Sequence, residues 1–292
     1  MTGPLRGTRV VDLTAFASGP LATAVLADQG ADVIKVERPG SGDEMRRMSQ
    51  SRGGLSAIFA TLNRNKRSIA LDLTQPRGRE LLQRLVESAD VFVQNFRPGV
   101  IERMGFGEPE LRALNRELVY VSISAFGESG PYAQRKVFDS VIQVLAGFAS
   151  AQADPETGEP QLMRTMVCDK TTALVAAQAI TAALLARAGG RGGQHVRLNM
   201  FDASVAFFWV DGMARQTFVG EDDGAGDGDP ESRPRRPGMS LRRAADGYMT
   251  ISTVPQDQFE GVCRAMGRPE LIDDPRFADA GARMRHIEEM EA

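Results

Sequence analysis

The sequence predicts an α/β fold, in which a doubly wound, mainly parallel, Rossmann-like sheet is followed by a second, smaller α+β domain. Over roughly the first two hundred residues, short apolar runs alternate with segments of helical length, a pattern typical of a parallel sheet covered by helices. This pattern stops at residues 221–238, EDDGAGDGDPESRPRRPG, which have no apolar periodicity. A short strand-and-helix pattern resumes after this stretch, which indicates a second unit.

The predicted elements follow one another in a regular order. The strand TRVVDL at residues 8–13 leads to a helix at 20–30, which ends at a glycine, and then to the strand ADVIKVE at 31–37. The large domain continues with a strand at 68–73, a helix at 76–89, a strand at 90–96, a short helical connection, a strand at 118–126, a helix at 166–187, a strand at 194–200 and a helix at 200–213. The small unit has a strand at 247–253 and a helix at 256–267.

These elements divide the 292-residue chain into three parts. We expect a large α/β domain over residues 1–219, a linker or loop over residues 220–238, and part of a small domain over residues 239–292. Because the last segment is a polar helix with no further strand, we expect the small domain to be incomplete at its C-terminus.

Composition and charge narrow the class of protein. A hydrophobic content of 42%, a charged content of 25% and a formal net charge of -3 are typical of a globular protein and give no global electrostatic case for nucleic acid. The most apolar helix, at residues 200–213, is too short and too charged to predict a membrane span. Two widely separated cysteines and the lack of a secretory signal favour a cytoplasmic protein.

The sequence gives little support for a metal or a nicotinamide cofactor. His195 and His286 are the only histidines and do not form a ligand-spaced pair, so no metal site is predicted. The turn after the first strand, TAFASGPLAT, lacks the GxGxxG pattern, although Glu37 stands where a ribose-binding acid would lie. Cys168 has no evident histidine partner, and a free cysteine is usually a small buried apolar residue.

One carboxylate, Asp169, stands at the start of the alanine-rich helix MVCDKTTALVAAQAITAALLAR. The first interpretation is a helix cap, because aspartate satisfies free N–H groups at helix N-termini. The capping box is incomplete, since Thr172 occupies the position that Glu or Gln would take. The second interpretation is a nucleophile that the helix N-terminus keeps ionised. Spacing by itself leaves both interpretations open.

Basic residues gather after several predicted strands and at helix starts. In a doubly wound sheet, ligands bind beyond the carboxyl ends of the strands, so several of these side chains could converge on one polyanion. The alternative is a solvated, arginine-rich surface. The set consists of Arg38, Arg46, Arg47, Arg64, Lys66, Arg67, Arg97, Arg103, Arg135 and Lys136.

Several longer stretches together carry a more specific pattern. They are VVDLTAFASGPLATAVLADQGADVIKVERPGSGDEMR, LNRNKRSIALDL, ADVFVQNFRPGVIERMGF, the Asp169 helix followed by GGRGGQHVRLNMFDASV, and then DGYMTIST and GRPELIDDPRF. This combination resembles the family III CoA-transferases, which include formyl-CoA transferase and carnitine CoA-transferase. The resemblance covers essentially the whole chain.

The resemblance implies a chemistry for the candidate residues. In that family an aspartate at the start of this helix attacks the acyl-CoA thioester, which implies acyl-aspartyl anhydride and aspartyl-CoA thioester intermediates on Asp169. It further implies an acyl-CoA and a carboxylic acid as substrates, an interlocked homodimer, and no cofactor beyond coenzyme A as substrate. The residues at matching CoA-binding positions are Ala17, Ser18, Arg38, Leu71, Asp72, Leu73, Thr74, Asn95, Phe96, Arg97, Arg103, Lys136, Val137, Phe138 and Asp139.

Two alternatives follow from departures from the family pattern. The related alpha-methylacyl-CoA racemases pair their aspartate with a histidine in a Gly-His-Asp stretch, whereas this chain reads KVFDS and has Phe138 at the histidine position. Two-base chemistry would therefore lack one base, so transfer is favoured over isomerisation. The family is also longer than this chain, which keeps open a non-catalytic CoA-binding subunit if the short C-terminus is native.

Overall fold

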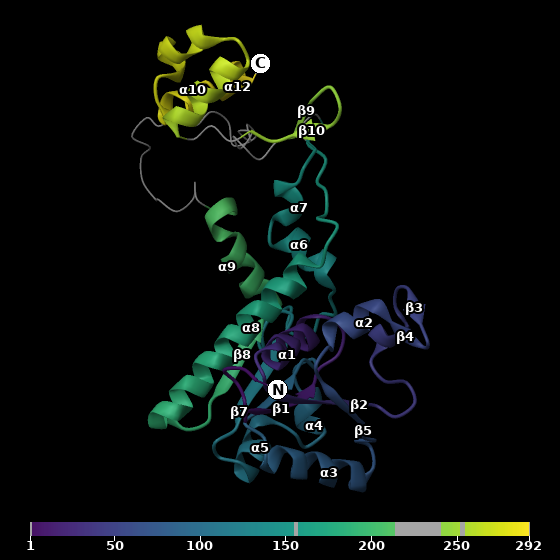
Figure 1. Cartoon of the computed structure of the whole chain (residues 1–292). Helices are drawn as coiled ribbons and strands as arrows, with labels where there is room; N and C mark the ends of the chain where they lie inside the picture. Colours follow the sequence, from purple (N-terminus) through teal and green to yellow (C-terminus); the bar gives the residue numbers. More distant parts are fainter. Residues whose placement is uncertain (1, 155–156, 214–240, 252–254, 292) are drawn as a thin grey trace. The chain divides into compact units, whose positions relative to one another are not determined.

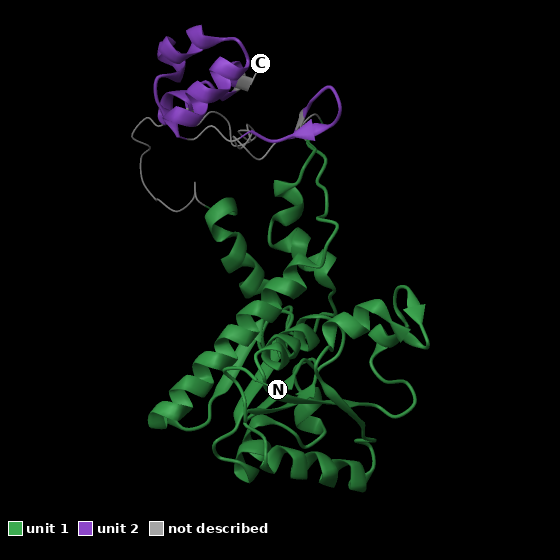
Figure 2. Ribbon diagram, viewed as in Figure 1, with its two compact units in different colours: residues 1–218 green, residues 219–292 purple. Residues whose placement is uncertain are grey.

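The computed structural model describes residues 2–154, 157–213, 241–251 and 255–291 (Figure 1). The chain divides into two compact units, residues 1–218 and residues 219–292 (Figure 2). The linker that was predicted over residues 220–238 lies outside the described residues.

The first unit contains a six-stranded sheet in which all neighbouring strands run parallel. The strands stand in the order β5-β2-β1-β6-β7-β8, so the order reverses between β1 and β6. This is the order of a doubly wound sheet, and it confirms the predicted α/β fold. The strands are β1 (Arg9–Leu13), β2 (Asp32–Glu37), β5 (Arg67–Ala70), β6 (Val91–Gln94), β7 (Val119–Ser124) and β8 (His195–Asn199).

The helices α1 (Ser18–Asp28) and α8 (Val167–Ala186) pack together on one face of this sheet. Small side chains allow their close approach, since Ala22 of α1 and Ala176 of α8 are fully buried in one core cluster. The segment Val167–Arg191 is long and apolar enough in composition to cross a membrane, and 28% of its most apolar stretch is buried. The buried side of α8 belongs to the core of the first unit.

The opposite face of the sheet is covered by α3 (Pro76–Glu87), α4 (Val100–Arg103) and α5 (Glu108–Leu114). The pleat turns Val11 toward these helices, whereas its neighbour Val10 faces α1 and α8. The sheet is therefore the central layer of three, and the loops at its carboxyl edge are the usual place for a ligand.

The strand β5 ends earlier than the predicted range of 68–73, because the chain turns at Asp72. The Asp72 carboxylate accepts hydrogen bonds from the Thr74 backbone N–H at 3.0 Å and from its hydroxyl at 2.6 Å. The next helix lies directly against this turn. A Cβ on Gly78 would stand 2.0 Å from the Asp72 carbonyl oxygen, so only glycine fits there.

Several short elements around the sheet were not predicted from the sequence, because they are too short to show a clear apolar period. One of them, α6 (Asp139–Leu145), packs against α8 and becomes important for the site. The others are η1 (Glu44–Arg47), β3 (Ser51–Arg52), β4 (Leu55–Ser56), α2 (Ala57–Leu62), α7 (Phe148–Ala151) and η2 (Arg187–Arg191). The predicted helix at residues 200–213 is present as α9 (Met200–Gly212).

The second unit is small and contains both strands and helices, as predicted. Its core consists of the buried side chains of Phe259, Cys263 and Phe277. The predicted strand at 247–253 is short and pairs in an antiparallel hairpin, and residues 252–254 lie outside the described part. The elements are β9 (Arg242–Arg243), β10 (Tyr248–Met249), α10 (Gln256–Ala265), η4 (Pro269–Asp273), η5 (Pro275–Phe277), α11 (Ala280–Arg285) and α12 (Ile287–Glu291).

Candidate active site

Most positions that were expected to contact CoA lie in loops at the carboxyl edge of the sheet. Ala17 and Ser18 follow β1, Arg38 follows β2, residues 71–74 follow β5, and residues 95–97 follow β6. Since these four strands are adjacent and parallel, their loops meet at one edge. Arg103 ends α4 on the outer layer, and residues 136–139 lead into α6.

Asp169 is the third residue of α8 and is half-buried. The N-cap of this helix is Met166, whose side chain makes no capping hydrogen bond, and Asp169 lies inside the first turn, so the interpretation of Asp169 as the cap of its own helix is wrong. Hydrogen bonding from Ser18, the first residue of α1, reaches the Asp169 carboxylate and lowers its pKa. The N-terminal residue of α1 therefore helps to support the carboxylate charge.

The net effect of the surroundings is to raise the pKa of Asp169 to about 6, first through burial and second through the nearby Asp139 carboxylate. The prediction that its own helix keeps this acid ionised is therefore incomplete, because burial and the Asp139 charge outweigh the hydrogen bonds from Ser18 and raise the pKa. Asp169 is a stronger base than an ordinary aspartate and is still mostly ionised at neutral pH.

The neighbouring carboxylate, Asp139, is the first residue of α6 and is 8% exposed. Its Oδ2 accepts the Asp169 backbone N–H at 2.9 Å, and its Oδ1 accepts the Gln143 side-chain amide at 2.5 Å. Both oxygens are thus engaged by groups of the protein. From the sequence, Asp139 was expected at a CoA-contact position, and its pairing with Asp169 was not predicted.

The loop between β1 and α1 is held in a strained conformation beside the sheet. Phe16 has a φ of 65°, which is uncommon for a residue with a side chain. Asn95 holds the loop from the neighbouring strand, since its Oδ1 accepts the Ala15 N–H at 2.9 Å and its Nδ2 donates to the Ala15 carbonyl at 2.8 Å. The ring of Phe16 meets that of Phe138 edge to face at 5.9 Å. The Asn95 amide, predicted to contact CoA, is therefore occupied in holding this loop.

Two buried lysines also hold this loop in place through hydrogen bonds. Lys66 donates to the Asp12 carboxylate at 2.9 Å and to the Pro20 carbonyl at 2.8 Å. Lys35 donates to the Thr14 carbonyl at 2.9 Å. Because both ammonium groups are almost fully buried, their role is to fix the backbone between β1 and α1 rather than to bind an anion.

Four of the ten basic residues proposed for a polyanion are used in ion pairs inside the first unit, which corrects that part of the prediction. The pairs are Arg46–Glu37, Arg64–Asp28, Lys66–Asp12 and Arg67–Asp32. Within the described part of the chain, no ion pair engages Arg38, Arg97, Arg103 or Lys136. These four also stand at matching CoA-binding positions and remain the candidates for an anion. The other two of the ten are Arg47, which donates to the Ser41 carbonyl at 3.0 Å, and Arg135, whose guanidinium lies 5.5 Å from the centre of the Tyr132 ring.

An apolar pocket of about 230 Å³ lies beyond the carboxyl end of β7 and was not predicted. Aromatic rings form much of it, since Phe126 lies 5.4 Å from Tyr132 and 6.0 Å from Phe201 between ring centroids. Leu145, at the end of α6, completes its apolar lining. The only sequence signal for this pocket was the scattered set of aromatic residues, which no period connects.

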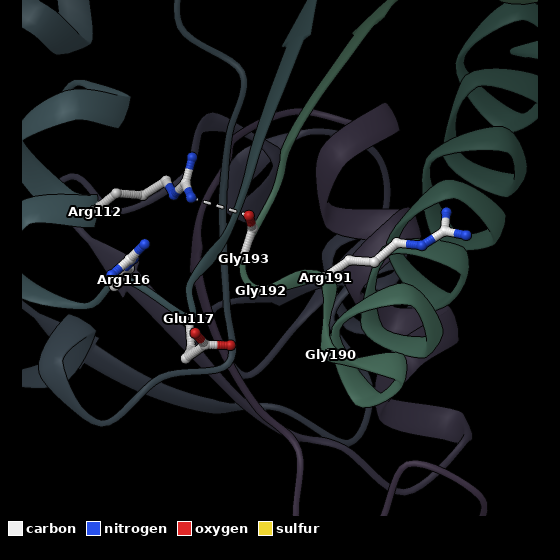
Figure 3. Close-up of a pocket in the computed structure, with 7 residues that line it drawn as sticks. All are labelled: Arg112, Arg116, Glu117, Gly190, Arg191, Gly192 and Gly193. Carbon is white, nitrogen blue, oxygen red and sulfur yellow. Dashed lines mark hydrogen bonds between the residues drawn. The ribbon is translucent and has the colours of Figure 1, made fainter.

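A second pocket, of about 380 Å³, lies at the opposite edge of the sheet, where Glu117 precedes β7 and Gly193 precedes β8 (Figure 3). Arg112 donates to the Gly193 carbonyl at 3.0 Å and pairs with Glu108 at 2.9 Å. Arg191 also lines the pocket, but its side chain points away from Arg112 (Figure 3). The arginines do not converge, and the site lies away from Asp169.

Other potentially reactive side chains have structural roles. Cys168 is buried, and burial raises the pKa of its thiol to about 11, so it is a protonated core residue as expected. His195 begins β8 with its Nε2 2.9 Å from the Ser122 hydroxyl. Among the residues that the structure describes, no group of three or more His, Cys, Asp or Glu side chains is arranged to hold a metal ion.

Comparison with known proteins identifies the family. Residues 5–292 match CoA-transferase family III. This chain belongs to that family. The probable fatty acyl-CoA transferase Rv3272 of Mycobacterium tuberculosis is 36% identical over 303 residues, covering 99% of this chain and 75% of the relative. The acetyl-CoA:oxalate CoA-transferase of Acetobacter aceti is 33% identical over 290 residues, covering 99% of this chain and 74% of the relative.

The solved structures agree with the sequence relatives. A crystal structure of Rv3272 superposes with a TM-score of 0.84 at 34% identity and covers 99% of this family III chain and 76% of the other. The described units therefore have the fold of family III CoA-transferases, and the chain is an enzyme of the CoA-transferase type. It spans about three-quarters of the length of these relatives.

Proposed function

We propose that this enzyme moves CoA from an acyl-CoA to a carboxylic acid through covalent intermediates on Asp169. The observation that carries the proposal is a half-buried carboxylate whose pKa is raised to about 6 and which the Ser18 end of α1 supports. Such a group is ionised at neutral pH and more basic than a free aspartate, which favours attack on a thioester carbonyl. Cys168 is a poor competitor, because its pKa is raised to about 11.

The proposed reaction exchanges one activated carboxyl group for another. An Asp169 oxygen attacks the thioester carbonyl carbon, the carbon–sulfur bond breaks, and the CoA thiolate leaves with the bonding electrons, so that an acyl-aspartyl anhydride forms. The thiolate then attacks the Asp169 carbonyl of the anhydride and releases the donor acid as its carboxylate. The acceptor carboxylate attacks the resulting aspartyl-CoA thioester, and the released thiolate captures the new acyl group and restores Asp169. No proton or electron is consumed, so the proposal requires no cofactor beyond CoA itself.

We further propose that CoA phosphates bind over the carboxyl edge near Arg38, Arg97, Arg103 and Lys136. The charges of these side chains are not used in ion pairs within the described residues, and guanidinium groups suit phosphate geometry. Arg38 also contributes to the lowered pKa of Asp72, after hydrogen bonding from Thr74, which links the loops after β2 and β5. The acyl group would lie toward Asp169.

The enzyme is proposed to work as a homodimer in the cytoplasm, with neither nucleic acid nor a membrane as partner. Large apolar side chains are exposed on three helices of the first unit: Val144 on α6 is 59% exposed, Leu174 on α8 is 59% and Val210 on α9 is 78%. A second copy would bury them. Light scattering should give twice the chain mass of 31.6 kDa, and Val210→Asp should shift the protein toward the monomer. A monomer at all concentrations would contradict the dimer.

Trapping the covalent intermediate tests the proposed function. The enzyme is incubated with acetyl-, formyl- or succinyl-CoA, trapped with hydroxylamine or borohydride, and digested with trypsin. Cleavage after Arg164 and Lys170 places Asp169 and Cys168 in one peptide, residues 165–170, and fragmentation tells the two side chains apart. Modification of Asp169 is expected. Modification of Cys168 in its place, or exchange of a substrate alpha proton with deuterated water without transfer, would overturn the proposal.

A further inference from the structure

The hydrogen bonds of Asp139 indicate a separate role for this residue in the site. We propose that Asp139 is a positioning residue, which holds the first turn of α8 and sets the pH range in which Asp169 attacks a thioester. This inference rests on the proposed function of Asp169. It replaces the CoA contact expected at Asp139, since both of its carboxylate oxygens already accept hydrogen bonds from the protein.

The geometry joins Asp139 to α8 by two routes. Directly, its Oδ2 accepts the backbone N–H of Asp169, one of the free donors of the first helical turn. Indirectly, it binds Gln143, whose amide also donates to the Thr165 carbonyl at 3.0 Å and accepts the Met163 N–H at 2.9 Å. Asp139 and Gln143 of α6 therefore hold both the first turn of α8 and the segment that leads into it.

The other charged side chains near Asp169 do not contribute to the shift of its pKa. The element α1 presents the uncharged Ser18, and α8 itself presents Lys170, whose ammonium group donates to the Thr165 hydroxyl at 2.7 Å. Asp202 on the neighbouring α9 is exposed. Among the described residues, Asp139 is the one charged group that shifts the Asp169 pKa, and no ion pair neutralises either carboxylate. Two carboxylates that share one buried region disfavour double ionisation, which makes the reacting one more basic.

The Asp139→Asn variant tests this role, because it keeps an acceptor for the α8 N–H and removes the charge. The Asp169 carboxyl carbon is followed by NMR during a pH titration of the free protein labelled with ¹³C-aspartate, and its signal is assigned by its loss in Asp169→Asn. We expect the pKa of Asp169 to fall by about one unit in Asp139→Asn. The rate of adduct formation with acetyl-CoA should decline at acidic pH, and the midpoint of this decline should move to lower pH by the same amount.

Two further variants keep the test decisive. Glu87→Gln removes the same charge at the exposed end of α3 and should leave both curves unchanged. Asp139→Glu keeps the charge but displaces the acceptor, so the raised pKa should persist while adduct formation slows. An unchanged Asp169 titration in Asp139→Asn would overturn the inference; if that variant does not fold, a normal adduct rate in Asp139→Glu would do so. If the parent protein forms no adduct on Asp169, the proposed function fails, whereas the titration of free protein still reports on Asp139.

Discussion

Replacing Asp169 with alanine is expected to abolish CoA transfer, with kcat reduced on the order of 10⁴-fold, because the proposed reaction has no other nucleophile. CoA binding should be nearly unchanged, since none of the proposed phosphate ligands is among the groups that act on the Asp169 carboxylate. Transfer is measured by the appearance of the acceptor's CoA thioester, and CoA affinity by calorimetry. The two readouts separate loss of chemistry from loss of binding.

The chain contains a matched control for this change. Asp202 is the third residue of α9, just as Asp169 is the third residue of α8, but its side chain is exposed and binds Asn199. Asp202→Ala should therefore keep its transfer activity apart from any loss of stability. A variant without Asp169 that transfers CoA at the parental rate would show that the carboxylate is not the nucleophile.

Replacing Lys66 with methionine is expected to lower the free energy of unfolding by about 3–5 kcal/mol, because it leaves a buried carboxylate without its partner. The Lys66 ammonium group donates to Asp12, Pro20 and Asn63, at distances of 2.9, 2.8 and 2.8 Å. The Asp12 side chain is fully buried. Burial opposes its ionisation, but the charges of Lys66 and Lys35 together with hydrogen bonds from Thr14 and Lys66 outweigh burial and lower the Asp12 pKa strongly. Urea denaturation followed by circular dichroism measures the change.

The neighbouring residue provides the comparison for Lys66. Arg67 pairs with Asp32 at 2.7 Å, but its side chain is 62% exposed, so Arg67→Met should cost at most about 1 kcal/mol. Removing the charge of Asp12 as well, in the double variant Asp12→Asn with Lys66→Met, should recover part of the lost stability. Equal effects of the two single variants would contradict a structural role for the buried pair.

Much of the fold could be predicted because its signals are local. The strands β1, β2, β6 and β7 are short and rich in valine and isoleucine, as expected of strands covered on both faces, although Asp12 and Lys35 interrupt the first two. The structure differs where side chains end an element early, as Asp72 does after β5. Short helices such as α6 were missed, since one or two turns are too few to establish a period.

The candidate site was only partly predictable. Asp169 and the loops after the strands were identified from the sequence, but the partners of these residues were not. Asn95 binds the loop at Ala15 from 80 residues away, and Lys66 binds Asp12 from 54 residues away. Side chains that were grouped as ligands of one anion therefore include several that hold the protein together, and their sequence positions do not reveal this difference.

The sequence by itself determined the order of strands and helices, the family to which the chain belongs, and the identity of the carboxylate at the start of α8. These properties depend on residue types and spacings along the chain. Only the tertiary structure decided that Ser18 of α1 donates to the Asp169 carboxylate, and that Asp139 lies against Asp169 from 30 residues away. The reason is physical: a pKa depends on burial and on nearby charges, and both are set by contacts between segments that the fold brings together.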